Sequence, residues 1–265
     1  RKSARRYLDK PVKRADIEYI IGCAGKAPSA INLQPWEYVV THGREKDRLV
    51  RRLLKTHAAK NASCGPGTSE PLPQLFAARS RKAVKAMKPQ VAKVDPDFNH
   101  FIEHGSCSFY GAPVAIIVCM DSIFPSIRYL DVGLSVSYLF LAAQELELST
   151  CPIGLITEYG DEIKDSLNID GNKQVLLGVA LGYADEEAPE NDMKPERESV
   201  ENFLTWYEYG VTMIVNNIND KDVLDTTYRA HGGAVAQMIL DRRHLEALGF
   251  LAIARLMPGK PIEYH

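Results

Sequence analysis

The first six residues of the chain concentrate cations around a hydroxyl group. They read Arg-Lys-Ser-Ala-Arg-Arg, so Arg1, Lys2, Arg5 and Arg6 flank Ser3. A phosphate monoester, which carries roughly two negative charges at neutral pH, binds well to a guanidinium fork joined by hydroxyl and amide donors. The segment therefore suits a phosphate group, although a basic terminus taken alone is more often simply solvated.

A second polar segment lies between two prolines, over residues 27–36 (Ala-Pro-Ser-Ala-Ile-Asn-Leu-Gln-Pro-Trp). Pro28 ends the preceding helix, and Pro35 keeps the residue before it extended. Ser29, Asn32 and Gln34 then offer donors and acceptors from a stiff backbone, which suits a flat ligand with polar edges. The alternative is that these side chains only cap and turn the chain.

A third segment runs from Ser149 to Leu155 and contains Cys151, Pro152 and Gly154. Proline stiffens this backbone, and glycine permits the close approach of a flat ring. Cys151 has no histidine or aspartate nearby in the sequence to activate it, so we do not expect a catalytic thiol.

Hydrophobic periodicity predicts the elements that position these segments. The apolar run 112–119 is typical of a central strand covered on both faces. The helix expected over 131–144 is apolar nearly all round, which predicts burial on all sides, in the core or in a large dimer interface. The helix expected over 75–94 is strongly basic; it is either a solvated face or a mobile lid that favours an anionic or carboxylated substrate. Further helices are expected over 13–26 and 44–60, a helix around 100–104, strands over 37–41 and 175–182, and a flexible loop over 61–74.

Composition limits the class of protein. A chain of 265 residues, 45% hydrophobic and with a net charge of −2, allows one large or two modest globular domains and gives no global sign of nucleic-acid or membrane binding. Five scattered cysteines without a CxxC pair favour reduced thiols and a cytoplasmic location. His100 and His104 stand four residues apart, but no third ligand has a matching spacing, so we expect no metal.

Four segments in this order resemble the motifs of the nitroreductase family: the basic N-terminus, residues 27–36, residues 149–155, and Lys194–Val200 with Arg197. The resemblance covers residues 1–209 and ends in a segment, 203–209, similar to the family's closing strand. It implies an α+β fold, with a mostly antiparallel central sheet covered by helices. It also implies an obligate homodimer with helix 131–144 at the interface and two flavins bound between the subunits.

The resemblance also implies FMN as cofactor, NAD(P)H as electron donor and an electron-poor acceptor of the nitroarene or quinone type, used in a ping-pong scheme. The flavin carries the chemistry, so no catalytic side chain is expected. The residues implied on the phosphate side are Arg1, Lys2, Ser3, Arg5 and Arg197, with Lys194 the less favoured neighbour of Arg197. Those implied for the ring and ribityl edges are Pro28, Ser29, Asn32 and Gln34, and those for the reactive edge of the ring are Pro152, Ile153 and Gly154. Lys2 stands where the family often has a second arginine, which keeps the charge but loses a bidentate contact.

The tail, residues 210–265, extends past the usual end of the family. Gly259 and His265 have the spacing of the first cupin motif, so the tail resembles the beginning of a truncated cupin domain. This suggests an alternative function, in which a flavin-binding redox or ligand sensor serves a fused cupin domain.

Overall fold

The computed structural model describes residues 1–65, 67–68 and 70–206. The chain divides into two units, Arg1–Glu196 and Arg197–His265, and of the second only residues 197–206 are described. These contain one 3₁₀ turn, η6 (Val200–Asn202). Residues 203–206 of the predicted closing strand are not in a strand, and its remainder lies outside the described residues, as do the predicted boundary after residue 209 and the cupin-like tail.

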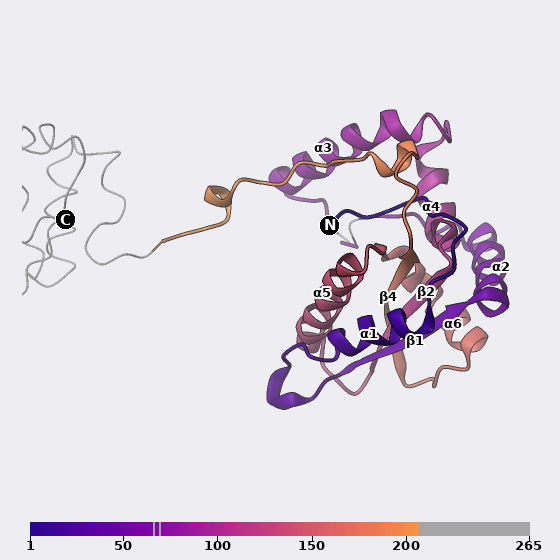
Figure 1. Cartoon of the computed structure of the whole chain (residues 1–265). Coiled ribbons are helices and arrows are strands. Elements are labelled where there is room, and N and C mark those ends of the chain that lie inside the picture. The colour runs from indigo at the N-terminus through magenta and orange to yellow at the C-terminus, as the bar shows by residue number, and fades with distance from the viewer. Residues whose placement is uncertain (66, 69, 207–265) are drawn as a thin grey trace, which may run out of the picture. The chain divides into compact units, whose positions relative to one another are not determined.

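The first unit is built on a four-stranded sheet in the order β1-β2-β4-β3 (Figure 1). The strands are β1 (Trp36–His42), β2 (Val114–Asp121), β3 (Ser149–Ile153) and β4 (Lys173–Gly182). Every neighbouring pair is antiparallel, with Ile116 of β2 opposite Val40 of β1 and Val179 of β4. The α+β class with an antiparallel central sheet is confirmed.

The described chain contains six α-helices. They are α1 (Arg14–Ala24), α2 (Gly43–Lys60), α3 (Gln74–Val91), α4 (Phe98–Cys107), α5 (Tyr129–Glu145) and α6 (Gly160–Leu167). Short 3₁₀ turns connect them: η1 (Ala30–Asn32), η2 (Phe109–Gly111), η3 (Ser126–Arg128), η4 (Leu155–Tyr159) and η5 (Pro189–Asn191). Helix α3 packs on α4 and η5 rather than on the sheet. The sequence pattern missed α6 and the turns because each is too short to show a clear period. None of the described helices has the length and apolar character to cross a membrane.

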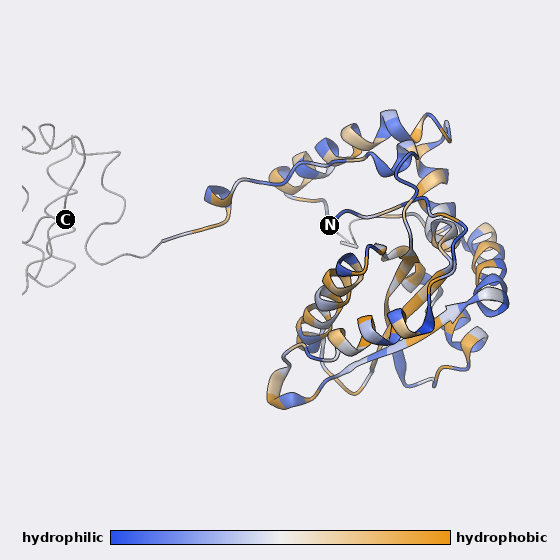
Figure 2. Cartoon of the chain, viewed as in Figure 1, coloured by the Kyte–Doolittle hydropathy of each residue, from blue (hydrophilic) through white to orange (hydrophobic). Residues whose placement is uncertain are grey.

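Strand β2 separates two hydrophobic layers. Its alternate side chains Ala115, Ile117 and Cys119 join a cluster with residues of α2, α4, α6 and η4. Val114, Ile116, Val118 and Met120 join a second cluster with α1 and α5, on the opposite face of the sheet. All these side chains are almost fully buried, and Figure 2 shows β2 as mainly hydrophobic. The prediction of a central, doubly covered strand is confirmed.

Helix α5 is only half covered within one chain. Its inner face, which includes Val132, Val136 and Leu139, packs against α1 and the sheet, but a stripe of apolar side chains on the opposite face is exposed. The stripe consists of Leu130, Leu134, Tyr138 and Leu141, with exposed fractions of 65, 37, 41 and 64%. No described element covers this face, so the single chain does not bury α5 on all sides in its own core, and the predicted alternative, burial in a large dimer interface, stays a prediction.

Candidate functional site

The N-terminal segment lies along the free edge of β3. Ser3 forms a parallel bridge with Thr150, and the Ala4 N–H donates to the Thr150 carbonyl at 3.1 Å. Strand β3 is an edge strand, so its outer side is open to this pairing. Because the bridge is parallel, the residues after Ser3 run in the same direction as Thr150 to Pro152. The sheet edge thus brings two of the segments singled out in the sequence together.

Three of the predicted phosphate ligands gather at this edge. The Arg1 guanidinium donates to Ser3 Oγ at 3.3 Å and lies 4.6 Å from the centroid of the Phe140 ring. The Arg5 guanidinium lies over the ring of Tyr110, and its Nε is buried with no hydrogen-bond partner among the described residues. A buried, unsatisfied donor on a cation is unfavourable unless an acceptor binds there. The arrangement fits a phosphate group, whose oxygens are acceptors of the required charge.

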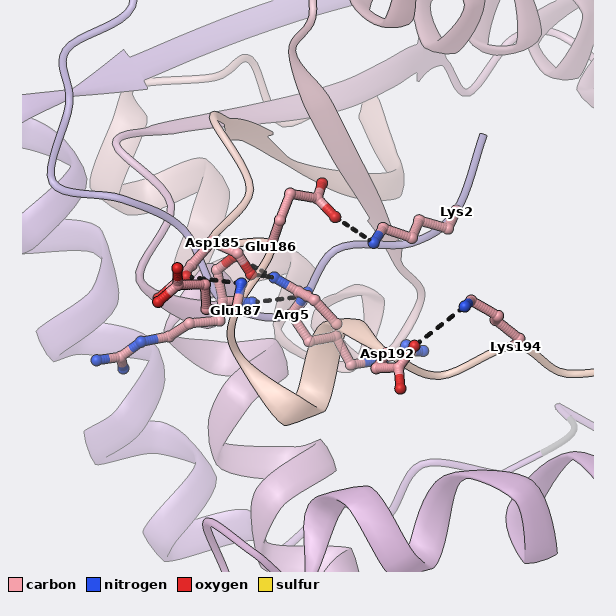
Figure 3. Close-up of polar contacts among 9 residues, drawn as sticks. Lys2, Arg5, Asp185, Glu186, Glu187, Asp192 and Lys194 are labelled. Atoms are coloured by element: carbon pink, nitrogen blue, oxygen red, sulfur yellow. Dashed lines mark hydrogen bonds and ion pairs between the residues drawn. The ribbon is translucent and has the colours of Figure 1, made fainter.

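Lys2 points elsewhere. Its Nζ forms an ion pair with Glu186 Oε2 at 2.7 Å, beside the acidic loop that follows β4 (Figure 3). The structure therefore does not place Lys2 with Arg1 and Arg5, and its role at a phosphate stays a prediction.

Asn191 fixes the backbone of the N-terminal segment. Its Oδ1 accepts from the Arg5 and Arg6 N–H groups at 2.6 and 3.2 Å, and its Nδ2 donates to the carbonyls of Arg6 and Asp185 at 2.7 and 2.8 Å. The side chain is 1% exposed, and all of its usual bonding positions are engaged. Sequence reasoning missed this residue, because a single asparagine in an acidic stretch has no distinctive spacing.

Strand β3 continues from the basic cluster to the segment predicted to meet a flat ring. Pro152 and Ile153 pair with Val179 and Gly178 of β4, which holds the segment rigidly against the sheet. Gly154 follows at the end of the strand, and a Cβ placed there would meet open space. The backbone after Ile153 is therefore accessible to a flat ligand.

Cys151 is the buried neighbour of this segment. Burial raises the pKa of its thiol, and the charges of Arg5 and Arg1 and the hydroxyl of Ser3 offset this only in part. A thiol that is 2% exposed and has a raised pKa is a poor nucleophile.

The loop over residues 28–34 is largely exposed and carries two internal hydrogen bonds that involve side chains. Ser29 Oγ accepts from the Gln34 N–H at 3.0 Å, and Gln34 Nε2 donates to the Asn32 carbonyl at 3.3 Å. Ile31, Asn32 and Gln34 all have positive φ, and all three are exposed. Pro28 is also exposed, whereas Ser29 is half-buried. The polar edges that the sequence predicted are therefore presented to solvent.

The loop and the basic cluster lie at different ends of α5. The Ala30 N–H donates weakly, at 3.4 Å, to Asp131 in the first turn of α5, whereas Arg1 lies over Phe140 near its last turn. Asp131 and Phe140 are nine positions apart, which corresponds to about 13.5 Å along the helix. Figure 1 shows the loop reaching away from the N-terminus beyond the first turn of α5. Arg197, the remaining predicted ligand, belongs to the second unit, and its role stays a prediction.

Comparisons with known proteins agree with the motifs. The model of the nitroreductase family matches residues 1–183. A 4-nitrobenzoate reductase of Pseudomonas putida is 32% identical over 205 residues, which cover 77% of this chain and 90% of the relative. The FMN-dependent nitroreductase NfnB from Mycobacterium smegmatis, solved in complex with NADPH, has a TM-score of 0.72 at 24% identity, covering 78% of this chain and 95% of that one. NfnB from sphigopyxis sp. strain HMH, described as an FMN and NADPH-dependent nitroreductase, has a TM-score of 0.70 at 25% identity, covering 79% and 96%. The chain therefore belongs to the nitroreductase family, whose members are FMN-dependent NAD(P)H oxidoreductases.

Proposed function

We propose that this chain is the subunit of a homodimeric, FMN-dependent oxidoreductase that takes electrons from NAD(P)H and passes them to an electron-poor aromatic acceptor. The observation that carries the proposal is the basic cluster at the edge of β3. Arg1 donates to Ser3 there, the charges of both Arg1 and Arg5 act on the neighbouring Cys151, and Arg5 Nε is buried without an acceptor among the described residues. A phosphate monoester would satisfy that donor and neutralise both guanidinium groups.

Pro152, Ile153 and Gly154 would line the reactive edge of the ring. Pro152 and Ile153 end β3, the strand that pairs with the N-terminal segment at Ser3, and the open space at the following Gly154 lets a planar group approach the backbone. Bound FMN would supply the hydride-accepting and electron-donating chemistry. The chain's own part is to hold the phosphate, present backbone dipoles to the ring and leave one side open for the reactants.

Two observations support a homodimer. The exposed stripe of α5 (Leu130, Leu134, Tyr138 and Leu141) is an apolar face that a second copy could cover symmetrically. The polar loop over residues 28–34 lies away from the basic cluster of its own chain. In a symmetric dimer, the loop of one subunit would complete the site formed by the N-terminus and β3 of the other.

The acceptor is proposed to be a nitroarene, with preference for one that carries a carboxylate. Helix α3 carries five cations and no acidic residue. Of these, Arg81, Lys82 and Lys85 are exposed and form no ion pair with any described residue. Helix α3 also packs against η5, the turn whose Asn191 holds Arg5. The relative from Pseudomonas putida, a 4-nitrobenzoate reductase, supports the same preference.

The donor and the acceptor are proposed to occupy the same open side in turn, with the oxidised nucleotide leaving before the acceptor binds. This is a ping-pong scheme, and parallel double-reciprocal plots in both substrates would support it. Dependence on NAD(P)H and the free cysteines of the described chain support a cytoplasmic location.

The test begins with the absorbance spectrum of the purified protein after incubation with FMN and removal of the excess. Bound flavin that bleaches on anaerobic NAD(P)H addition and recovers on addition of 4-nitrobenzoate is the expected result. R5Q should weaken FMN binding, whereas R14Q, which alters an exposed arginine whose one ion pair within the described residues is with Glu18, should not. A protein that binds no FMN overturns the proposal. Equal kcat/KM for nitrobenzene and 4-nitrobenzoate, unchanged by the R81Q/K82Q/K85Q variant, overturns the preference for an anionic acceptor.

A further inference from the structure

The guanidinium of Arg5 lies against an aromatic ring that comes from a different part of the chain. Arg5 Cζ lies 5.8 Å from the centroid of the Tyr110 ring, within the range of a cation–π contact. Tyr110 follows α4 in the turn η2, whereas Arg5 belongs to the N-terminal segment. Burial raises the pKa of the Tyr110 hydroxyl, and the charge of Arg5 lowers it in part, which places the two groups in one enclosed environment.

The Tyr110 ring is fixed from several sides. It packs directly on the backbone of α4 at Gly105, where an added Cβ would lie 2.3 Å from Tyr110 Cε1. The Phe101 ring contacts the Tyr110 ring, with their centroids 5.9 Å apart. The Tyr110 hydroxyl donates to the Ile102 carbonyl at 3.4 Å. The ring is 8% exposed, so little freedom remains for it to rotate away from Arg5.

The backbone that presents this ring is strained. Phe109, Tyr110 and Gly111 have φ values of 52, 52 and 73°, so two bulky residues adopt the left-handed conformation. The turn sends the two rings to different places. The Phe109 ring packs on Gly178 of β4, so closely that a Cβ added to Gly178 would lie 3.1 Å from Phe109 Cε1. The Tyr110 ring packs on Gly105 and faces Arg5. Strain of this kind persists only where the surroundings enforce it, and it is concentrated at functional sites.

We propose that Tyr110 is a positioning residue, which holds the Arg5 guanidinium in the orientation that binds the phosphate of FMN. The inference rests on the proposed function, in that Arg5 must contact the phosphate. The backbone of Arg5 is fixed by Asn191, and the ring of Tyr110 fixes its side chain. The unsatisfied Nε is thereby kept in place before the cofactor binds, which reduces the ordering that binding requires.

The decisive measurement compares FMN with riboflavin, which lacks the phosphate. Dissociation constants of both flavins for the full-length apoprotein are obtained from flavin fluorescence, for wild type, Y110L, Y110F and R5A. We expect Y110L to reduce the preference for FMN over riboflavin about tenfold, with riboflavin affinity changed less than about twofold. Y110F keeps the aromatic face and should retain most of the preference. Y159L is the control, because Tyr159 is a buried, hydrogen-bonded tyrosine whose ring lies 5.9 Å from Lys60 Nζ, so it removes a cation–π contact that does not involve Arg5.

The outcomes separate this inference from the proposed function. If wild type shows no preference for FMN, or if R5A leaves the preference unchanged, the assignment of Arg5 to the phosphate fails. If R5A loses the preference but Y110L keeps it, or if Y110L weakens both flavins equally, Tyr110 has no positioning role. If Y110L does not fold, G105A replaces it, because the added Cβ displaces the same ring from the side of α4. G105A is expected to lower the preference for FMN over riboflavin in the same way. An unchanged preference in a folded G105A protein overturns the inference.

Discussion

Replacing Asn191 with alanine should destabilise the apoprotein by loosening the N-terminal segment. The asparagine makes four hydrogen bonds, at 2.6, 2.7, 2.8 and 3.2 Å, from a side chain that is 1% exposed. A typical bond of this kind contributes a net of about 1 kcal/mol. The Arg6 carbonyl keeps a second donor, the Asp185 N–H at 3.1 Å, and Arg6 is exposed, so water can replace part of what is lost there. We therefore expect N191A to lose roughly 2–3 kcal/mol of the free energy of unfolding.

Urea unfolding at one fixed protein concentration measures this loss, and hydrogen exchange at the Arg5 amide locates it. N172A is the control, because Asn172 is exposed and its side chain donates only to Asp121, at 2.8 Å; we expect a change within about 0.5 kcal/mol. N191D distinguishes the two halves of the amide. It keeps the oxygen that accepts from Arg5 but turns a carboxylate oxygen toward two carbonyls, so it should be at least as unstable as N191A. An N191A protein of wild-type stability with an equally protected Arg5 amide would refute the reasoning.

Other predictions follow from close packing and from one surface ion pair. G182A should destabilise the fold by about 1–3 kcal/mol, because its Cβ would lie 2.5 Å from Pro113 Cδ in a rigid ring, whereas G171A, which meets open space, should be neutral in the same urea assay. The hydrogen bond between His100 Nδ1 and Asp95 Oδ2, at 2.7 Å, raises the pKa of His100. The stabilisation from this hydrogen bond is therefore complete at a pH below about 6.5, the pKa of histidine in the unfolded chain. It is lost as the pH rises through the higher pKa that His100 has in the folded protein. D95N should bring the His100 pKa back toward its usual value in an NMR titration, and an unchanged titration curve would contradict the assignment.

Periodic sequence patterns predicted most of the fold because they record burial directly. The continuous apolar run in β2 corresponds to a strand with helices on both faces, and the apolar residues of α5 correspond to a helix with little polar surface. The hydrophobic pattern could not show which face of α5 is buried within its own chain. Burial in the core and burial in an interface require the same composition, so periodicity alone does not separate them.

Residues of the proposed site could be singled out from the sequence only where they are close together in the chain. Arg1, Ser3 and Arg5 form a local motif, in which Arg1 donates to Ser3 while the charges of Arg1 and Arg5 both act on Cys151. Asn191, 186 positions after Arg5, and Tyr110 act on the same arginine through contacts that no short motif contains. Such supporting residues emerge only when the fold brings distant segments side by side.

The distribution of backbone strain links the two parts of the proposed site. Among the described residues, Asn61 and Asn168 have positive φ as ordinary helix caps, but Ile31, Phe109 and Tyr110 are bulky residues for which the conformation is unfavourable by about 1–3 kcal/mol each. For Phe109 and Tyr110 the packing of their buried rings offsets the unfavourable backbone conformation. Ile31 is 91% exposed, so no packing within the described chain offsets its strain. A contact from outside the single chain would account for it, and the proposed dimer, in which this loop meets the flavin site of the second subunit, supplies such a contact.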